Sequence, residues 1–553
     1  MTVSHDLATP IVVLVSTRAV LTLPEDKLVL TPATISISPV TGKILDITSA
    51  VLPQSSFPAS TTYVDYGDKL LLPGLVDAHV HLNEPGRTEW EGFWTGTRAA
   101  ASGGVTTVVD MPLNAIPPTT TVAGFKEKLA ASEGQCWVDV GFYGGVIPGN
   151  ADELLPLVEA GVRGFKGFLI ESGVDEFPAV SAQDIALAMK TLNGTPTTLM
   201  FHAEMIPPIA DSVGDAVQQS EPPAAPTGEL TSYNTFLESR PPSFETYAVE
   251  EILSLAHLAP DLHLHIVHLS ATQAIPLLRN ARQNGINITA ETCFHYLGFA
   301  SEDIADGDTR HKCCPPIRER SNRDGLWEEL VAEDSCIKTI VSDHSPCTPQ
   351  LKLLPASLEA PPPPTEESLS RPKMHHADSG IDMTIPGERL NKIIAEKTLE
   401  EAAVAVAEAS TKGDFFAAWG GISSVGLGLP IVHSASVARI AEAGEGAAPS
   451  ILDIVRLCSQ ATAKQVGLSH RKGALKVGMD ADICVFDDAD IWTLRSGDMR
   501  WKNKCSPWEG HEFTGRVRDT WVRGRKVWEF GGVNGGFIGQ GPVGEAITEK
   551  RIA

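Results

Sequence analysis

The spacing of apolar residues changes along the chain and divides it into distinct parts. From 10 to 72, short β-branched runs alternate apolar and polar positions, a pattern typical of strands separated by turns. From 75 to about 345, continuous apolar runs alternate with stretches of helical periodicity, which predicts βα units around a parallel sheet. The eight candidate strands are 75–81, 105–111, 137–144, 162–169, 197–203, 262–269, 286–291 and 338–343. Eight such strands predict an α/β fold, a (β/α)8 TIM barrel.

The pattern becomes β-like again near the C-terminus. Residues 450–467 have helical periodicity, whereas 472–487 and 514–532 have the pattern of strands. We therefore predict a small, discontinuous β-sandwich domain built from residues 1–72 and 471–532, flanking a barrel domain of residues 73–470. The Gly-rich residues 533–553 are expected to form a flexible tail.

Residues 355–411 interrupt the barrel pattern. Four consecutive prolines at 361–364 and a charged, Ser-rich composition predict a disordered insert in the loop after the last barrel strand. Within it, the Ala/Glu-rich stretch 391–410 has the composition of a single helix. A lid or partner role and a neutral insertion both remain open for this segment.

Polar residues occupy the C-terminal ends of several predicted strands, which is where function sits in such barrels. His79 and His81 are two residues apart on the first strand, so both imidazoles project to the same side. The other residues at strand ends are Lys166, His202, His268 and Asp343. His263 and His265 lie deeper in their strand, and we assign both to the core. Four imidazoles and a carboxylate together suit a borderline cation such as Zn²⁺.

Lys166 is the unexpected member of this set, because a protonated lysine is repelled by cations. Two metal ions held about 3.5–4 Å apart need a bridging anion, and no glutamate stands at an obvious strand end to supply it. The flanking Phe165 and Phe168 disfavour a surface position for Lys166, and burial beside positive charge lowers the pKa of a lysine. A neutral amine can add carbon dioxide and become a carbamate, which is a carboxylate on a long stem.

Composition and charge exclude several classes of protein. With 42% hydrophobic and 20% charged residues, the chain has the composition of a soluble globular protein, and its net charge of −25 argues against a nucleic-acid or anionic-membrane partner. Nine cysteines, an odd number without a disulfide pattern, fit reduced thiols in an intracellular compartment. No apolar run approaches the roughly 20 residues that span a bilayer. The last residues, 551–553, are not the peroxisomal S-K-L signal; we expect a cytoplasmic location, with a peroxisomal one as the open alternative.

Two motifs carry a family resemblance. The stretches LLPGLVDAHVHLNEPGRTEWEG at 71–92 and GTRAAASGGVTTVVDMPLN at 96–114 resemble the cyclic amidohydrolases of the amidohydrolase superfamily, and most of all the allantoinase branch. The resemblance runs from about residue 10 to about residue 530 apart from the insert. It implies two divalent metal ions, most simply Zn²⁺, held by His79, His81, His202, His268 and Asp343 and bridged by carbamylated (N6-carboxylated) Lys166. It further implies Asp343 as general base, a metal-bridging hydroxide as nucleophile, and a homotetramer.

The residues expected to face a small-molecule substrate are Asn83, Asn114, Cys293, His295 and Ser345. Dihydroorotases, which this chain resembles, carry an arginine where Asn83 stands; a neutral amide instead suits an uncharged ureido or imide group. The segment ETCFHYL at 291–297 is similar to the family's E-T-C-P-H-Y-L, with Phe294 in place of proline.

The reaction implied by the resemblance is the hydrolytic opening of the hydantoin ring of allantoin to allantoate. The nearest alternative is another cyclic amidohydrolase, a hydantoinase or dihydropyrimidinase. An alternative of a different class is a non-catalytic scaffold with the same fold, which acts through oligomer surfaces and lacks metal ligands.

Overall fold

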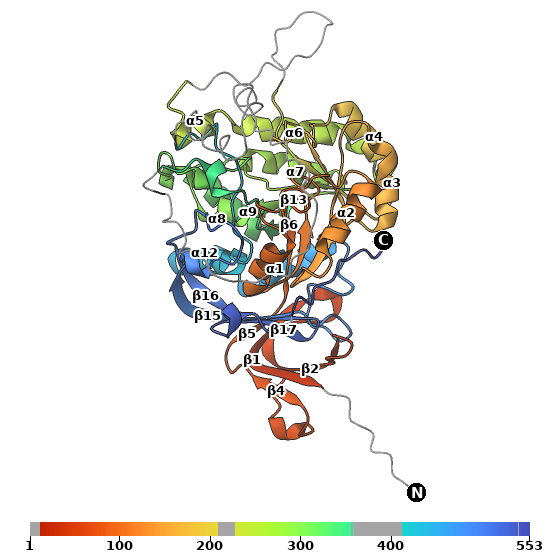
Figure 1. The fold of residues 1–553 in the computed structure, drawn as a ribbon, viewed down its shortest axis with the longest axis vertical. Helices are drawn as coiled ribbons and strands as arrows, with labels where there is room; N and C mark the ends of the chain where they lie inside the picture. The colour runs from red at the N-terminus through yellow and green to blue at the C-terminus, as the bar shows by residue number, and fades with distance from the viewer. Residues whose placement is uncertain (1–10, 208–226, 356–357, 359–411, 540, 553) are drawn as a thin grey trace, which may run out of the picture.

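The computed structural model describes residues 11–207, 227–355, 358, 412–539 and 541–552. A large α/β part lies above a smaller β part, and the N-terminal strands form the far end of the molecule (Figure 1). Among the described helices, none is long and apolar enough to cross a membrane.

Eight parallel strand segments form the barrel at the centre of the α/β part. They are β6 (Leu75–Val80), β7 (Val105–Asp110), β8 (Asp139–Phe142) continued by β9 (Gly144–Gly145), β10 (Phe165–Phe168), β11 (Thr198–His202), β12 (His263–Ile266), β13 (Ile288–Cys293) and β14 (Ile337–Val341). They pair in the orders β6-β7-β8 and β9-β10-β11-β12-β13-β14. Each of the eight predicted strands is therefore present.

Backbone hydrogen bonds join these two ladders into a closed ring. Tyr143 N donates to Asp110 O at 2.9 Å, and Gly144 N donates to Gly164 O at 2.9 Å, so β8 and β9 act as one strand. On the other side, His81 N donates to His344 O at 2.8 Å, and Val80 and His344 form a parallel bridge. The fold prediction of a (β/α)8 barrel is confirmed.

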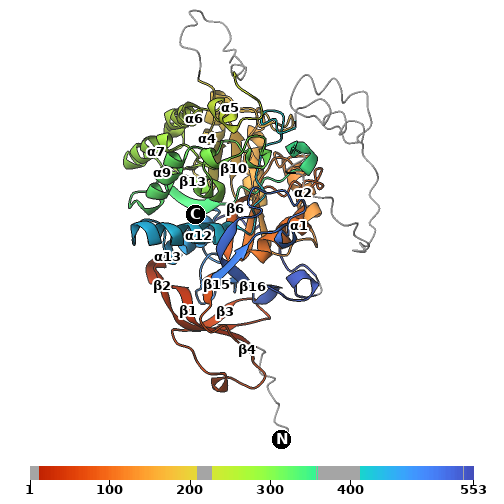
Figure 2. The ribbon, with the colours of Figure 1, turned by 90° about the vertical axis from the view of Figure 1, so that its left-hand side faces the viewer.

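Helices cover the outside of the barrel. They are α1 (Phe93–Ser102), α2 (Val122–Ser132), α3 (Ala151–Ala160), α4 (Ala182–Leu192), α5 (Tyr233–Glu238), α6 (Pro242–Leu255), α7 (Ile275–Gln283), α8 (Phe294–Gly298), α9 (Arg320–Val331), α12 (Gly428–Ala443), α13 (Ile451–Val455) and α14 (Ala461–Gln465). Ser181 and Ser450 begin α4 and α13 with capping boxes, in which the serine and an aspartate three residues on satisfy each other's backbone N–H groups. Helices α12 and α13 lie between the barrel and the small domain (Figure 2).

The small domain draws its strands from both ends of the chain. These are β1 (Val12–Thr22), β2 (Leu28–Ile37), β3 (Ile44–Thr48), β4 (Thr62–Asp65), β5 (Leu70–Pro73), β15 (Ile483–Thr493), β16 (Glu512–Val522) and β17 (Arg525–Glu529). They form one hydrogen-bonded sheet in the order β17-β16-β15-β5-β1-β2-β3, with β4 beside β1. The junction between the two halves is β5 with β15, where Leu72 pairs with Cys484.

Both faces of this junction are buried, because side chains alternate along a strand. Leu70 and Leu72 point into the barrel-side core, whereas Leu71 points into a second core inside the small domain. Ile483 and Val485 of β15 join Leu71 there. The sheet therefore packs on the barrel with one face and around its own core with the other.

A cluster of buried charged side chains links the small domain to the barrel at the N-terminal ends of the barrel strands, which we call the barrel floor. The Lys472 ammonium lies 2.6 Å from Asp139 at the start of β8, and 2.6 Å and 3.0 Å from Asp482 and Asp480 of the turn before β15. All four side chains are almost fully buried. Three carboxylates around one ammonium are also a set of ligands that suits a cation, but the lysine already occupies the centre of the set.

Lys472→Met should destabilise the protein by about 3 kcal/mol, because it removes the counter-charge that three buried carboxylates share and leaves only Arg523 on Asp139 and Arg471 and Lys43 on Asp480. The thermal unfolding midpoint measures this loss. Lys550→Met is the matched control, since the Lys550–Glu159 pair is about two-thirds exposed and exposed pairs contribute little. An equal shift in the two variants would contradict the role of the cluster.

Residues 541–552, expected to be part of a flexible tail, lie along the barrel floor. Gly544 N donates to Cys136 O at 2.8 Å, Ile547 N donates to Val140 O at 2.8 Å, and the Arg551 guanidinium donates to Arg163 O. The tail is anchored by backbone pairing with the start of β8, which its Gly-rich composition did not reveal.

The predicted insert, 355–411, falls almost entirely outside the described residues, so its disorder and the helix at 391–410 remain predictions. The residues on either side of it are described and lie close together, because Gly413 N donates to Leu353 O at 2.6 Å. The chain thus leaves and re-enters the barrel domain at one point.

Joining Leu354 to Lys412 should therefore leave the melting temperature nearly unchanged, since the new connection spans a short gap. Differential scanning fluorimetry of the shortened chain measures this. Insoluble protein would show that the insert packs on the core and that its boundary is misplaced.

Candidate metal centre

The six residues predicted at strand ends meet at one end of the barrel. Each is buried, with at most 6% of the residue exposed. They come from β6 and its end (His79, His81), β10 (Lys166), the last residue of β11 (His202), and the loops after β12 (His268) and β14 (Asp343).

Their side chains form a continuous row. His79 Nε2 and His81 Nε2 lie 3.1 and 3.6 Å from Asp343 Oδ1. Lys166 Nζ lies 3.4 Å from His79 Nε2 and 3.5 Å from His268 Nε2. At the far end, His268 Nε2 lies 3.0 Å from His202 Nδ1. Lys166 therefore stands between two histidine groups, as a bridge would.

Glu291 on β13 fixes the orientation of one group. Its Oε1 accepts from His79 Nδ1 at 2.5 Å and from the backbone N–H of His268 at 3.3 Å, while Oε2 accepts from His265 Nε2 at 3.2 Å. Because an ionised carboxylate only accepts, His79 carries its proton on Nδ1 and turns the Nε2 lone pair toward Lys166. Burial alone would raise the pKa of Glu291, but the His79 and His265 rings lower it to about 2.

Glu204 orients the second pair of histidines, His202 and His268, in the same way. Its Oε2 accepts from His202 Nε2 at 2.8 Å and from Arg240 at 2.7 Å, which leaves the Nδ1 lone pair of His202 facing His268. Burial opposes ionisation of Glu204, but the Arg240 charge helps to lower its pKa to about 2.

Sequence analysis missed both carboxylates, and it assigned His265 to the core without its contact to Glu291. A glutamate does stand near the end of the seventh strand, but Glu291 faces the outer nitrogen of His79 and cannot bridge two metals. Glu204 had a usable signal, because it follows His202 by two residues and so points to the same side of the extended chain. Glu291 had no such signal, since its partners lie on other strands.

The donor set fits metal ions. Imidazole ligands bind zinc at about 2.0–2.1 Å, so two ligands of one tetrahedral ion lie about 3.3 Å apart, close to the spacings found here. His79, His81 and Asp343 form a group whose donor atoms lie within 4.8 Å of one another. Burial lowers the pKa of Lys166 to about 8, which favours the neutral amine that carbamate formation requires.

The backbone is strained at this site. Among the nine non-glycine residues with positive φ in the described chain are Asn83 (61°), Asn114 (68°), His268 (37°) and Asp343 (44°). Such conformations cost of order 1–3 kcal/mol each and cluster at functional sites.

The five residues expected to face substrate lie around this centre. Ser345 Oγ donates to Asp343 Oδ1 at 2.9 Å, and Asn114 Nδ2 lies 3.4 Å from His81 Nδ1. Cys293 and His295 each place a donor atom within 4.8 Å of an Asp343 oxygen. Asn83 Nδ2 donates to Pro346 O at 3.3 Å, whereas its Oδ1 has no partner among the described residues.

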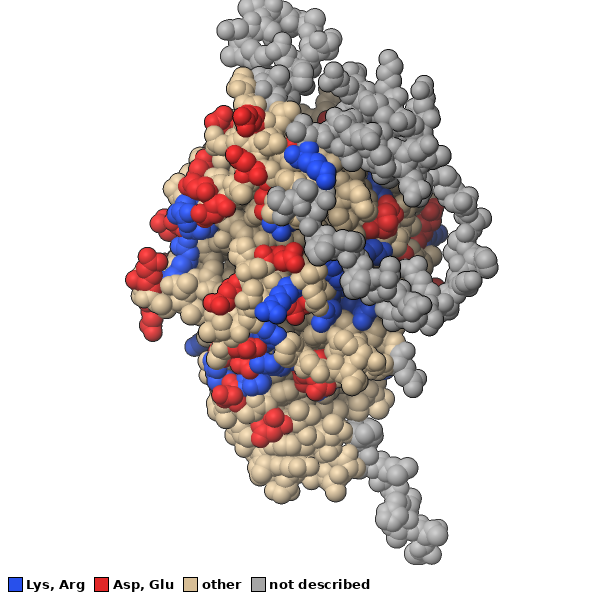
Figure 3. Space-filling model, turned by 60° about the vertical axis from the view of Figure 1, so that its left-hand side comes forward, with Lys and Arg blue, Asp and Glu red and all other residues tan. Residues whose placement is uncertain are grey.

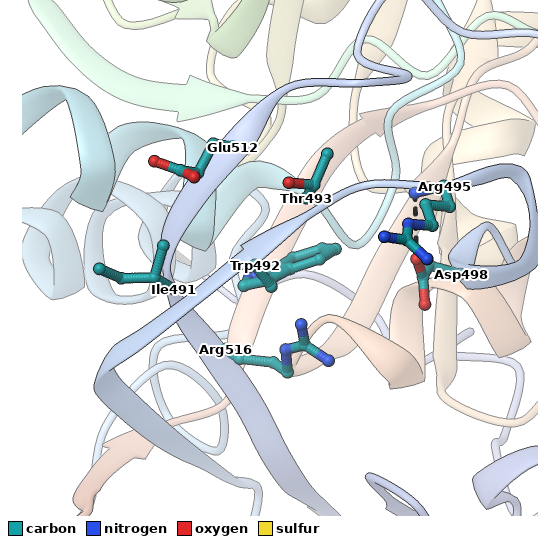
Figure 4. A pocket seen from close by; sticks show the side chains of 7 residues that line it. All are labelled: Ile491, Trp492, Thr493, Arg495, Asp498, Glu512 and Arg516. Atoms are coloured by element: carbon teal, nitrogen blue, oxygen red, sulfur yellow. Dashed lines mark hydrogen bonds between the residues drawn. The ribbon is translucent and has the colours of Figure 1, made fainter.

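A surface pocket of about 390 Å³ lies elsewhere, on the hairpin of β15 and β16, lined by Ile491, Trp492, Thr493, Arg495, Asp498, Glu512 and Arg516 (Figure 4). The Arg516 guanidinium already stacks 4.4 Å from the centre of the Trp492 ring and pairs with Asp490. No residue is shared with the barrel centre.

Comparison with known proteins identifies the family of the chain. Models of the amidohydrolase family match residues 70–358 and 435–528. The chain is 43% identical to the allantoinase of Saccharomyces cerevisiae, with 94% of this chain and 96% of the relative aligned. It is 37% identical to the allantoinase of Streptomyces avermitilis over 90% and 92% of the two chains.

Solved structures agree in fold. The L-hydantoinase of Arthrobacter aurescens superposes with a TM-score of 0.73 at 24% identity, covering 97% of this chain and 99% of the other. The dihydropyrimidinase of Brevibacillus agri gives 0.71 at 22% identity over 98% and 99%. By the extent of its sequence identity, the chain belongs to the amidohydrolase family and, within it, to the allantoinases.

Proposed function

We propose that this protein is a metal-dependent allantoinase that adds one water across the ring amide of allantoin, breaks its C–N bond and yields allantoate. The observation that carries the proposal is the buried row of donors in which Lys166 Nζ lies 3.4 and 3.5 Å from histidines of two different groups. That arrangement suits a pair of metal ions.

The two ions have separate ligands in this proposal. His79, His81 and Asp343 would hold one ion, His202 and His268 would hold the other, and a carbamate on Lys166 would supply an anionic ligand between the two groups. Zn²⁺ matches the nitrogen and oxygen donors. When bound, the ions supply an activated water and polarise the substrate carbonyl.

Asp343 and Ser345 then carry out the proton transfer that the hydrolysis requires. Burial opposes ionisation of Asp343, but His79 lowers its pKa well below the ordinary value, so the side chain is a carboxylate, the form that a general base requires. Ser345 donates to Oδ1 and steadies the carboxylate while it passes the proton to the leaving ring nitrogen.

A panel of cyclic amides at fixed metal loading tests the proposal. Allantoin should be the best substrate, ahead of hydantoin and dihydrouracil. Preference for either of the latter would move the assignment to a hydantoinase or dihydropyrimidinase. Protein that binds no metal and hydrolyses none of the panel would favour the non-catalytic scaffold.

Glu291→Gln should weaken metal binding by about 10- to 100-fold, as loss of an outer carboxylate partner does in other metal sites. A glutamine carbonyl can accept from His79 or His265, but the amide N–H₂ then opposes the second imidazole. Equilibrium dialysis against zinc measures the affinity without any turnover.

Glu329→Gln is the matched control, since Glu329 of α9 is also buried but bonds Arg279 and the backbone N–H of Cys336. It should retain metal. Unchanged affinity in Glu291→Gln would show that the carboxylate does not orient the ligands.

We further propose a cytoplasmic homotetramer. Exposed apolar side chains, among them Leu30, Val40 and Leu45 (43%, 70% and 48% exposed), lie on the small domain, and charged side chains are sparse over its lower end in Figure 3. Light scattering during size-exclusion chromatography tests the assembly. Cell fractionation tests the location, which differs in the frog relative named as mitochondrial.

A further inference from the structure

Three donor atoms form a second group, which shares Asp343 with the candidate metal centre. They are Cys293 Sγ at the end of β13, a ring nitrogen of His295 in α8, and a carboxylate oxygen of Asp343, all within 4.8 Å of one another. Each residue is at least nine-tenths buried. Sulfur, nitrogen and oxygen donors gathered in this way differ from the sulfur-free set around Lys166.

His295 independently points to a ligand. Its ring is 1% exposed, and neither ring nitrogen has a hydrogen-bond partner among the described residues. A buried polar group without a partner costs about 1–3 kcal/mol, so a bound ligand would recover that cost. The position is firmly held, because Phe294 between the two donors packs closely on Gly428 of α12.

We propose that Cys293, His295 and Asp343 form a third, inhibitory site for a thiophilic divalent cation such as Zn²⁺ or Cd²⁺. Ligand atoms of one zinc ion lie about 3.3–3.7 Å apart, given bond lengths of about 2.0–2.3 Å. The three atoms therefore need to approach one another by at most about 1.5 Å. Binding replaces the thiol proton, which leaves to solvent, and a water fills the fourth position. Hard ions such as Mg²⁺ and Mn²⁺ avoid thiolate.

The functional consequence rests on the proposed function. A third ion engages Asp343, which then cannot accept the proton of the reaction. Zinc beyond two equivalents should consequently inhibit hydrolysis, and excess Mn²⁺ should not.

Cobalt titration tests the site without substrate. The first two equivalents meet only nitrogen and oxygen donors, whereas a third should add a thiolate-to-Co²⁺ charge-transfer band in the near ultraviolet. Cys293→Ser should abolish that band, and the matched buried variant Cys458→Ser should keep it. His295→Gln should weaken the third equivalent at least tenfold in equilibrium dialysis. A band that survives in Cys293→Ser, or the absence of a third equivalent in the wild type, would overturn the proposal.

An activity measurement separates this proposal from the proposed function. The rate of each variant in excess zinc is divided by the rate of the same variant at two equivalents of metal. The resulting loss of rate should be at least tenfold larger for the wild type than for Cys293→Ser. Equal inhibition would refute the site as its cause. Failure to hydrolyse allantoin would refute the proposed function and leave the cobalt result standing.

Discussion

Lys166→Ala is expected to lose both metal ions and to reduce kcat/KM by about 10⁴-fold or more, since metal activation of water supplies much of the rate in such enzymes. Lys166 Nζ stands between the two histidine groups and is almost fully buried. Without a carbamate at this position, two cations would share a site with one carboxylate, Asp343, and their mutual repulsion would be uncompensated. Metal analysis and steady-state kinetics on one preparation measure both effects.

Chemical rescue distinguishes loss of the bridge from loss of the fold. A short carboxylic acid in the buffer can occupy the space left by the side chain and should restore part of the metal binding. Lys128→Ala is the control for removing a buried lysine, because Lys128 pairs with Asp110 and not with the histidines; it should keep its metals. Electron density for an unmodified amine on Lys166 in the fully metallated wild type would refute the bridge.

The barrel could be predicted because its strands are buried on both faces. Such strands appear as short continuous apolar runs, and the runs at 75–81 and 105–111 end within one residue of β6 and β7. The break between β8 and β9 at Tyr143 was not visible, since it depends on neighbouring strands. For the same reason the anchored tail at 541–552 was missed: its pairing partner, β8, lies some 400 positions away in the chain.

The site could be predicted to the extent that each residue carried its own local signal. His79, His81 and His202 stand at or just after the ends of apolar strands, and parallel strand ends meet at one edge. The contact that decides which ring nitrogen of His79 carries the proton comes from a residue on another strand. Glu291 reaches His79 from β13, and nothing near Glu291 in sequence indicates that pairing. The positive φ values of His268 and Asp343 were equally hidden, because neither residue type demands that conformation.

Substrate selection should depend strongly on Asn83, with kcat/KM for allantoin at least about a thousandfold above that for dihydroorotate. Asn83 is 1% exposed, and its Oδ1 is an acceptor without a partner. A ureido N–H can donate to this oxygen. If the substrate carries a carboxylate where allantoin has its ureido group, two hydrogen-bond acceptors face each other and the charge stays unpaired in a buried site. An unpaired buried charge costs several kcal/mol, and each 1.4 kcal/mol is about tenfold in rate. Arg87, the nearest arginine in sequence, is already paired with Glu176.

The positive φ of Asn83 limits which substitution can test its role in substrate selection. At φ 61° an arginine would be strained whatever its charge, so Asn83→Arg confounds strain with selectivity. Asn83→Gly removes the acceptor and keeps the backbone conformation. It should lower kcat/KM for allantoin by about tenfold, the worth of one buried hydrogen bond, without a matching loss for dihydroorotate. Asn534→Gly makes the same change at φ 55° on the small domain and should alter neither rate. Comparable wild-type rates on the two substrates would rule out Asn83 as the selector, because an unpaired carboxylate beside Oδ1 cannot be as stable as a bonded ureido group.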